Sequence, residues 1–322
     1  NIFHGLLHDI LRKYSDGFSL DVSALTEKNK GYTFISNHRD IVLDSGFLSV
    51  GLIDNNFPTT VEIAIGDNLL IYPWIKKLVR VNKAFIVQRA LSMRQMLESS
   101  ARMSSYIHFA VTQKRENIWI AQREGRAKDS NDRTQDSVLK MLAMGGSNDV
   151  IDSLKELNIV PLSLSYEYDP CDFLKAKEMQ LKRDIEGFKK SQQDDLDNMK
   201  TGIFGYKGRI HFHASQCINN ELEELRGLPK TEIFTHVSEI IDRHIHANYR
   251  MYPANYIAYD ILNGENNMSQ YYNDADIAKF NAYIDKKLSL IDIENKDESF
   301  LRERMLVMYA NPLINHLKAI KG

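Results

Sequence analysis

The chain has 322 residues, 43% of them apolar, which is enough for one large domain with a buried core, with or without a helical extension. Its 41 basic and 43 acidic residues nearly cancel, which argues against a nucleic-acid-binding protein by overall charge. No apolar run reaches the roughly 18 residues that a transmembrane helix needs. The two scattered cysteines, Cys171 and Cys217, make neither a disulfide framework nor a zinc motif and are typical of a reducing compartment.

Residues 1–30 are predicted to form an N-terminal helical segment. Apolar residues recur at helical spacing from Ile2 to Tyr14. We interpret this stretch as a helix that packs on the core, with a membrane-facing helix as the alternative.

From residue 31 onward, short apolar strands alternate with helical patterns. This order predicts an α/β fold with a largely parallel sheet flanked by helices, which we assign to residues 31–215. Strands are predicted at 32–36, 60–65, 84–88, 117–121, 158–165 and 206–213, and helices at 41–53, 67–80, 90–113 and 135–157.

The composition changes after residue 170. Residues 171–200 are dense in charge and predict an exposed helical insertion, because charge runs usually mark solvated faces. Residues 216–322 predict a mostly helical C-terminal region. Its helices are expected at 230–249, 253–262, 269–288, 297–309 and 312–320.

Chemically active side chains follow the first predicted strand of this domain at its carboxyl end, where open α/β sheets collect their ligand sites. His38 lies there, with Asp40 and Asp44 close behind it in the chain. A neutral imidazole that a carboxylate orients can remove a proton from a hydroxyl group. A lone histidine is more often structural, and it is the blocks that follow that favour catalysis.

Two later strands end in cations. One leads to Arg89, whose guanidinium group offers a planar fork of donors to phosphate, unless it is an ordinary surface arginine. The other leads to a loop in which Gly125 allows a tight turn among several charges. The charged residues of this loop are Arg123, Glu124, Arg126 and Lys128.

The strand predicted at 158–165 contains a proline. Proline cannot donate to a sheet ladder, so Pro161 predicts a sheet edge or a bend.

Together, and in this order, these blocks resemble the four motifs of the glycerophosphate acyltransferase superfamily (the PlsC-like family) over roughly residues 30–170. The matching residues are His38 with a following aspartate, then Phe85, Ile86 and Arg89, then Glu124, Gly125 and Arg126, then Val160 and Pro161. Asp67, Asn68 and Leu69 also look like the glycerol-3-phosphate acyltransferase side of the family.

Two positions depart from the family pattern. Five residues separate His38 from Asp44, where the family usually has four, so Asp40 is a rival partner for the histidine or a cap for the next helix. We favour Asp44. Ala127 stands where the family often has serine or threonine, although Lys128 preserves a cation.

The resemblance implies acyl transfer from acyl-CoA or acyl carrier protein to a hydroxyl of glycerol 3-phosphate or lysophosphatidate, in phospholipid biosynthesis. It implies that His38 is the general base and that Asp44 fixes its tautomer. The residues implied at the substrate phosphate are Arg89, Glu124, Gly125, Arg126 and Lys128. The resemblance implies no covalent intermediate, cofactor or metal. We expect a cytoplasmic protein in peripheral contact with the inner face of the membrane, because the acceptors are amphipathic.

Other groups favour structural roles. Met96, Leu97 and Met103 could line an acyl groove, but apolar groups at helical spacing are more often core. Trp74 could enter a bilayer. His211 and His213 are interpreted as surface groups rather than metal ligands.

Two alternatives remain open from the sequence. The acceptor could be another lipid, such as a lipid-linked amine, or the chain could be a catalytically silent lipid-binding relative.

Overall fold

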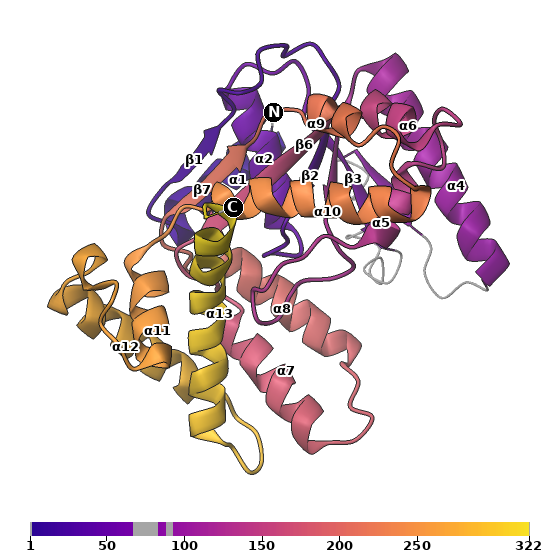
Figure 1. Ribbon diagram of the computed structural model, residues 1–322. Coiled ribbons are helices and arrows are strands. Elements are labelled where there is room, and N and C mark those ends of the chain that lie inside the picture. Colours follow the sequence, from indigo (N-terminus) through magenta and orange to yellow (C-terminus); the bar gives the residue numbers. More distant parts are fainter. Residues whose placement is uncertain (1, 67–82, 88–92, 322) are drawn as a thin grey trace.

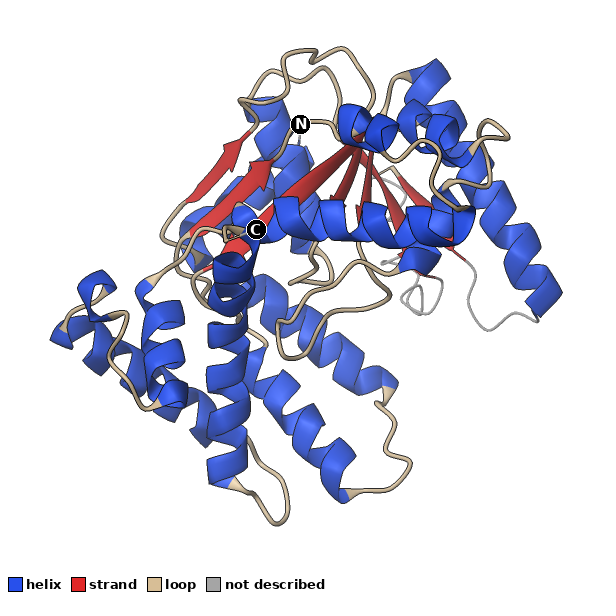
Figure 2. Cartoon of the chain, in the orientation of Figure 1, coloured by secondary structure: helices blue, strands red, loops and turns tan. Residues whose placement is uncertain are grey.

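The computed structural model describes residues 2–66, 83–87 and 93–321, and it has an α/β fold (Figures 1 and 2). Its seven-stranded sheet has the order β1-β7-β6-β2-β5-β3-β4, and β6–β7 is the one antiparallel pair among the described strands. The strands are β1 (Phe18–Asp21), β2 (Thr33–Ser36), β3 (Val61–Gly66), β4 (Ala84–Val87), β5 (Asn117–Ala121), β6 (Ile159–Tyr166) and β7 (Ile210–Ala214). The predicted fold class is therefore confirmed.

Helices cover both faces of the sheet and form the C-terminal region (Figure 1). Those before the charged segment are α1 (Ile2–Tyr14), α2 (Leu43–Asp54), α4 (Met93–Phe109) with its π-helical continuation η2 (Ala110–Lys114), α5 (Asp136–Leu142) and α6 (Val150–Glu156). The later ones are α7 (Asp172–Asp184), α8 (Gln192–Phe204), α9 (Asn219–Glu224), α10 (Lys230–Ala247), α11 (Pro253–Asn263), the 3-10 turn η3 (Ser269–Tyr271), α12 (Asp274–Ser289) and α13 (Glu298–Ala319).

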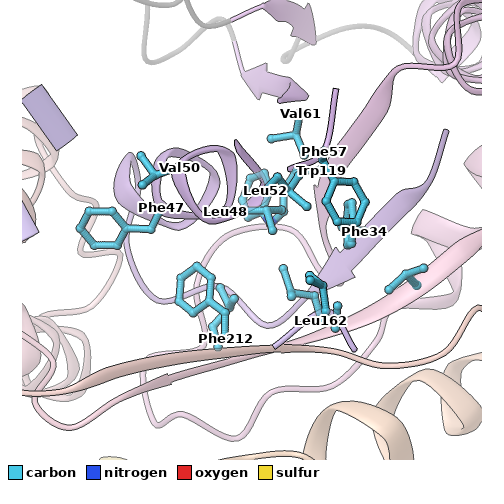
Figure 3. Packing of buried hydrophobic residues seen from close by; sticks show 14 of the residues in the cluster. Phe34, Phe47, Leu48, Val50, Leu52, Phe57, Val61, Trp119, Leu162 and Phe212 are labelled. Carbon is cyan, nitrogen blue, oxygen red and sulfur yellow. The ribbon is translucent and has the colours of Figure 1, made fainter. Parts of the chain in front are cut away.

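Successive side chains of a strand alternate between the two faces of the sheet, and β2 shows the consequence. Phe34 packs with Phe47 of α2 and Phe212 of β7 in the cluster on the α1–α2 side (Figure 3). Its neighbour Ile35 belongs to the other cluster, with residues of α4, α5, α6 and α10 such as Ile241. Both faces of β2 are thus buried, which positions its carboxyl end inside the layered fold.

A third apolar cluster holds the C-terminal helices together. It joins α11, α12 and α13 and includes Phe280, Met305 and Tyr309. Ala176 of α7 also belongs to it. The C-terminal region therefore packs around its own core, which α7 shares.

The predicted insertion is a pair of helices, α7 and α8, and α7 is not the solvated helix that its composition predicted. Lys175 is fully buried and forms an ion pair with Asp169, and Asp172 accepts hydrogen bonds from Tyr283 and Tyr309. Charge density alone does not reveal that these charges pair with one another.

Two further element predictions were wrong. Residues 18–21, expected in a helical segment, form the strand β1, whose four residues are too few for a clear alternation. The helix predicted over 135–157 is two helices, and Gly145, in the break between them, lies so close to α4 that a Cβ on it would be 2.3 Å from the backbone nitrogen of Ser105. The helix predicted over 67–80 lies outside the described residues.

Two predictions at prolines were wrong: a break between the helices expected at 297–309 and 312–320, and a sheet edge or bend at Pro161. Pro312 is within α13, where Tyr309 and Leu313 on either side of it are buried. Pro161 is in β6, an interior strand. The β6–β7 pairing begins at Leu162, so the missing N–H of Pro161 falls beyond the end of that ladder.

Candidate active site

The turn that carries His38 leaves the sheet beside the loop that carries Arg126. The strands β2 and β5 are parallel neighbours, and the Gln122 N–H continues their ladder by donating to the Ser36 carbonyl. Asn37 then anchors the turn to β6, because its side-chain amide donates to the Leu164 carbonyl and accepts from the Leu164 N–H, at 2.9 and 2.8 Å. We call residues 37–44 the β2 turn and residues 122–135 the β5 loop.

His38 contacts Asp44 directly. The Nδ1 atom of His38 lies 2.8 Å from Oδ2 of Asp44, and the two side chains are 14% and 1% exposed. Asp44 lies in the first turn of α2, and helical side chains point toward the N-terminus of their helix. Its carboxylate therefore reaches back toward the preceding turn, and the two residues meet without sharing a helical face.

The five residues that separate His38 from Asp44 bring two backbone N–H groups to the Asp44 carboxylate. The backbone N–H groups of Arg39 and Asp40 both donate to Oδ2 of Asp44, at 2.7 and 3.0 Å. The Tyr166 hydroxyl donates to the other oxygen at 2.9 Å. Burial, and then the charge of Asp44, raises the pKa of Tyr166 well above its ordinary value, so the hydroxyl keeps its proton. The β2 turn thus wraps around the carboxylate.

Asp40, the rival partner, is used elsewhere. Its Oδ1 accepts from the N–H groups of Val42 and Leu43 at 2.9 and 2.8 Å, which satisfies the start of α2. Its Oδ2 faces Gly202 of α8, where an added Cβ would come within 2.1 Å. Burial, and then the nearby charge of Asp44, raises the pKa of Asp40.

The second nitrogen of the His38 ring is available. Nε2 has no hydrogen-bond partner among the described residues, while the Asp44 contact at Nδ1 favours the tautomer that leaves Nε2 unprotonated. The Trp119 ring lies edge-on at 5.3 Å between ring centres, and its Nε1 donates to Ser36. Such an imidazole can accept a proton from a molecule at Nε2.

Arg126 lies near Asp40 and carries an unsatisfied donor. Its Nη2 donates weakly to Asn198 of α8 at 3.3 Å, whereas its buried Nη1 has no partner among the described residues. Its charge lowers the pKa of Asp40, against the larger effect of burial. A buried guanidinium nitrogen without an acceptor is costly, so this position suits an anionic ligand.

Lys128, expected at the phosphate, forms an ion pair instead. Its Nζ lies 2.7 Å from Glu178 of α7, which Lys182 and Lys190 also contact. Burial lowers the pKa of Lys128 to about 8, and the lysine contacts outweigh burial in lowering the pKa of Glu178 to about 2. Both groups are therefore charged at neutral pH, and Lys128 fastens the β5 loop to α7.

The structure gives fewer contacts for the other residues that were expected at the phosphate. Gly125 has φ +67°, the left-handed conformation that glycine adopts readily, and both it and Glu124 are exposed. The Glu124 N–H donates to Gln135. Arg89 lies outside the described residues, as do Asp67, Asn68, Leu69 and Trp74.

Sequence reasoning missed the residues that hold the β5 loop from the C-terminal region. Asp242 of α10 accepts from the N–H and hydroxyl of Thr134, and burial raises its pKa to about 6. Asn315 of α13 accepts from Arg133 at 2.8 Å. Within the loop, Asp132 pairs with Arg39 of the β2 turn at 2.9 Å. No spacing in the sequence signals these partners.

Apolar side chains also gather beside the β2 turn. Met199 and Leu196 of α8 pack with Ile41 and Val42, and with Ile65 and Ala84 at the ends of β3 and β4. In α4, by contrast, Met96 and Leu97 are exposed, whereas Met103 packs against the core cluster.

Two histidines expected at the surface differ from each other. His211 is 7% exposed, its Nδ1 lies 2.8 Å from Ser19, and burial lowers its pKa to about 4, so the surface interpretation was wrong for it. His213 is partly exposed, 3.3 Å from Asp21.

The comparisons with known proteins add a structural likeness. No protein-family model matches the chain, and a search of the curated proteins gives no match. Among solved structures, the chain is similar to the 1-acyl-sn-glycerophosphate acyltransferase PlsC from Thermotoga maritima, with 12% identity and a TM-score of 0.41, over 76% of this chain and 77% of that one. At that TM-score, the inference about function rests on the site itself. Among the described residues, no helix combines the length and the apolar character needed to cross a bilayer.

Proposed function

We propose that this chain transfers an acyl group from a thioester donor to a hydroxyl of a glycerophosphate. The observation that supports this most is one juxtaposition. An imidazole oriented by a buried carboxylate has its outer nitrogen free, and a guanidinium with an unsatisfied nitrogen lies at the same edge of the sheet. A base and an anion site together suit an acceptor that carries both a hydroxyl and a phosphate.

The His38 ring moves the proton. Its Nε2 takes the proton of the acceptor hydroxyl while the oxygen attacks the thioester carbon, and Asp44 stabilises the imidazolium. The tetrahedral intermediate then collapses, the carbon–sulfur bond breaks, and the proton returns from Nε2 to the departing thiolate. A single group thus serves as base and then as acid.

Arg126 binds the acceptor phosphate. Its unpartnered Nη1 gains a charge-assisted hydrogen bond, and the bound phosphate positions the hydroxyl near Nε2 of His38. Asn198 orients the guanidinium group from α8. Lys128 contributes positive charge at longer range, because Glu178 already holds it.

The acyl chain lies on the apolar cluster of Met199 and Leu196 beside the β2 turn. Acyl-CoA or acyl carrier protein supplies it, and the protein meets lysophospholipid acceptors at a membrane surface. Exposed apolar side chains on β4 and early α4, Ile86 and Leu97 among them, support that peripheral contact.

The test measures thiol release from acyl-CoA and from acyl carrier protein over a panel of acceptors: glycerol 3-phosphate, lysophosphatidate, an uncharged monoacylglycerol and a lipid amine. We expect turnover with the two phosphates alone, and none after His38→Ala. Turnover with the amine or the uncharged acceptor would identify a different acyltransferase. Lipid binding without turnover, unchanged by His38→Ala, would identify a silent relative and end the proposal.

A further inference from the structure

Two histidines of α1 and an aspartate of α2 converge on one point of the surface. His4 and His8 are four residues apart and therefore on the same face of α1, which packs on α2 (Figure 1). Asp54 is the last residue of α2. Among the described residues, this is the one group of three histidine, cysteine, aspartate or glutamate side chains whose ligand atoms lie within 4.8 Å of one another.

The distances between the three donor groups match those of a metal site. Nε2 of His4 lies 3.3 Å from Nε2 of His8, and the two nitrogens lie 2.9 and 3.2 Å from the oxygens of Asp54. In a tetrahedral zinc site with bonds of 2.0–2.1 Å, neighbouring donor atoms are about 3.3 Å apart. An ion therefore needs only small side-chain adjustments to reach all three.

The local charge also favours a cation. The C-terminus of a helix carries partial negative charge, and Asp54 adds a full negative charge there, on the end of α2 that repels it. A divalent ion offsets both. Hydrogen bonds from the two histidines to Asp54 are the competing explanation, and they would hold the same groups together without any metal.

We propose that His4, His8 and Asp54 bind a divalent transition-metal ion of the zinc type, with water in the fourth position. Two imidazoles and a carboxylate are ligands that zinc accepts, and two histidines one helical turn apart are a known way to present them. The ion fastens α1 to α2. The family resemblance implies no metal in the reaction, and this site lies outside the residues proposed for it.

The metal site is separate from the proposed chemistry. Asp54 follows Asp44 by ten residues along α2, roughly 15 Å at the helical rise. The metal proposal and the proposed function can therefore fail independently, and metal binding is measured without any turnover assay.

The experiment titrates ZnCl2 into the full chain, produced without a histidine tag and cleared of metal by a chelator, and follows binding by calorimetry and the melting temperature. We expect one zinc equivalent to bind and to raise the melting temperature. His8→Ala should weaken that binding at least about 100-fold, because even losing a group that only supports a ligand can cost that much. It should also abolish the thermal shift.

The matched control is His236→Ala. His236 contacts a single acid, Glu239, at 3.3 Å on the surface of α10, so its loss should leave the zinc equivalent intact. Zinc binding that His8→Ala leaves unchanged would overturn the proposal. So would a parent chain that binds no zinc below about 1 mM, since hydrogen bonds alone would then explain the cluster.

Discussion

The β2 turn and the β5 loop leave neighbouring parallel strands at the same edge of the sheet, but the β2 turn is held by its own N–H groups and by β6, whereas the C-terminal helices hold the β5 loop. In the β2 turn, the carboxylate of Asp44 is bound by His38 and by two N–H groups of the turn itself. In the β5 loop, the contacts come from far along the chain, with Asn315 lying 182 residues from Arg133.

This difference assigns the two proposed steps, proton transfer and phosphate binding, to different parts of the chain. The proposed proton transfer depends on contacts that form whenever the turn folds against β6. The proposed phosphate binding depends on α7, α8, α10 and α13 being docked. On this proposal the C-terminal region, which carries none of the four motifs, serves acceptor binding rather than proton transfer, and each of the following variants tests that division.

The largest effect should come from His38→Ala. Loss of the general base should lower kcat by about 10²- to 10⁴-fold, while the melting temperature stays close to the parent value because the side chain is not part of the core. Steady-state thiol release and circular dichroism measure the two. The control is His213→Ala, which removes another histidine–aspartate contact, with Asp21, and should leave kcat unchanged. Similar losses in both variants would remove the assignment.

Arg126→Ala should act on the acceptor. Losing a hydrogen bond to a charged group costs about 1.5–3 kcal/mol, so the KM for the acceptor should rise roughly 10- to 100-fold while the KM for the donor changes little. Lys128→Ala should raise that KM much less, because Lys128 is paired with Glu178, and should lower the melting temperature instead. Equal effects of Arg126→Ala on both substrates would contradict the phosphate role.

Asn315→Ala tests control of the β5 loop from a distance. Asn315 is buried, and its loss leaves Nη2 of Arg133 without an acceptor, while Nη1 keeps its contact with His246, so the change should cost about 1–3 kcal/mol of unfolding free energy in a denaturant titration. The acceptor KM should rise several-fold with kcat nearly kept. Asn263→Ala, which removes an exposed amide bonded within its own helix, should change neither. A fall in kcat at saturating acceptor would show that the two regions are not separate.

Tyr166→Phe should have the smallest effect. It removes one of the hydrogen-bond donors to Asp44. Such a bond contributes about 1 kcal/mol, so its loss should lower kcat by no more than roughly fivefold. The Asp44 carboxylate is then held in place less firmly behind the imidazole, so kcat should fall, and steady-state thiol release measures the fall. Tyr168→Phe is the control, since its hydroxyl makes no hydrogen bond with a described residue. A kcat equal to that of the parent chain would mean that Tyr166 only packs.

The sequence predicted what is local. Six of the strands and the placement of His38 at a strand end could be read from short apolar runs and the polar residues after them. Asp44 could be favoured over Asp40, but the hydrogen bonds from the N–H groups of Arg39 and Asp40 to Asp44 could not be foreseen, because no side-chain pattern records them. Helix boundaries that depend on packing, such as the continuation of α13 through Pro312, were out of reach.

The β5 loop shows where prediction ends. Its cations were visible in the sequence, but which of them would form an ion pair within the protein was not. Lys128 and Arg126 are two residues apart, and one meets Glu178 while the other keeps a nitrogen without a partner. That outcome was decided by a helix some 50 residues away, so composition could count the charges but could not show which remain for a substrate.

The side chain of Asn37 affects how rigidly the β2 turn is held. It replaces main-chain pairing with β6 at the point where β2 departs, and β6 is also the strand that delivers Tyr166 to Asp44. The side chains of His38, Asp44 and Tyr166 are therefore all held in place by β6. Motion of the outer helices would therefore displace the proposed phosphate site first and leave the distance between His38 and Asp44 unchanged.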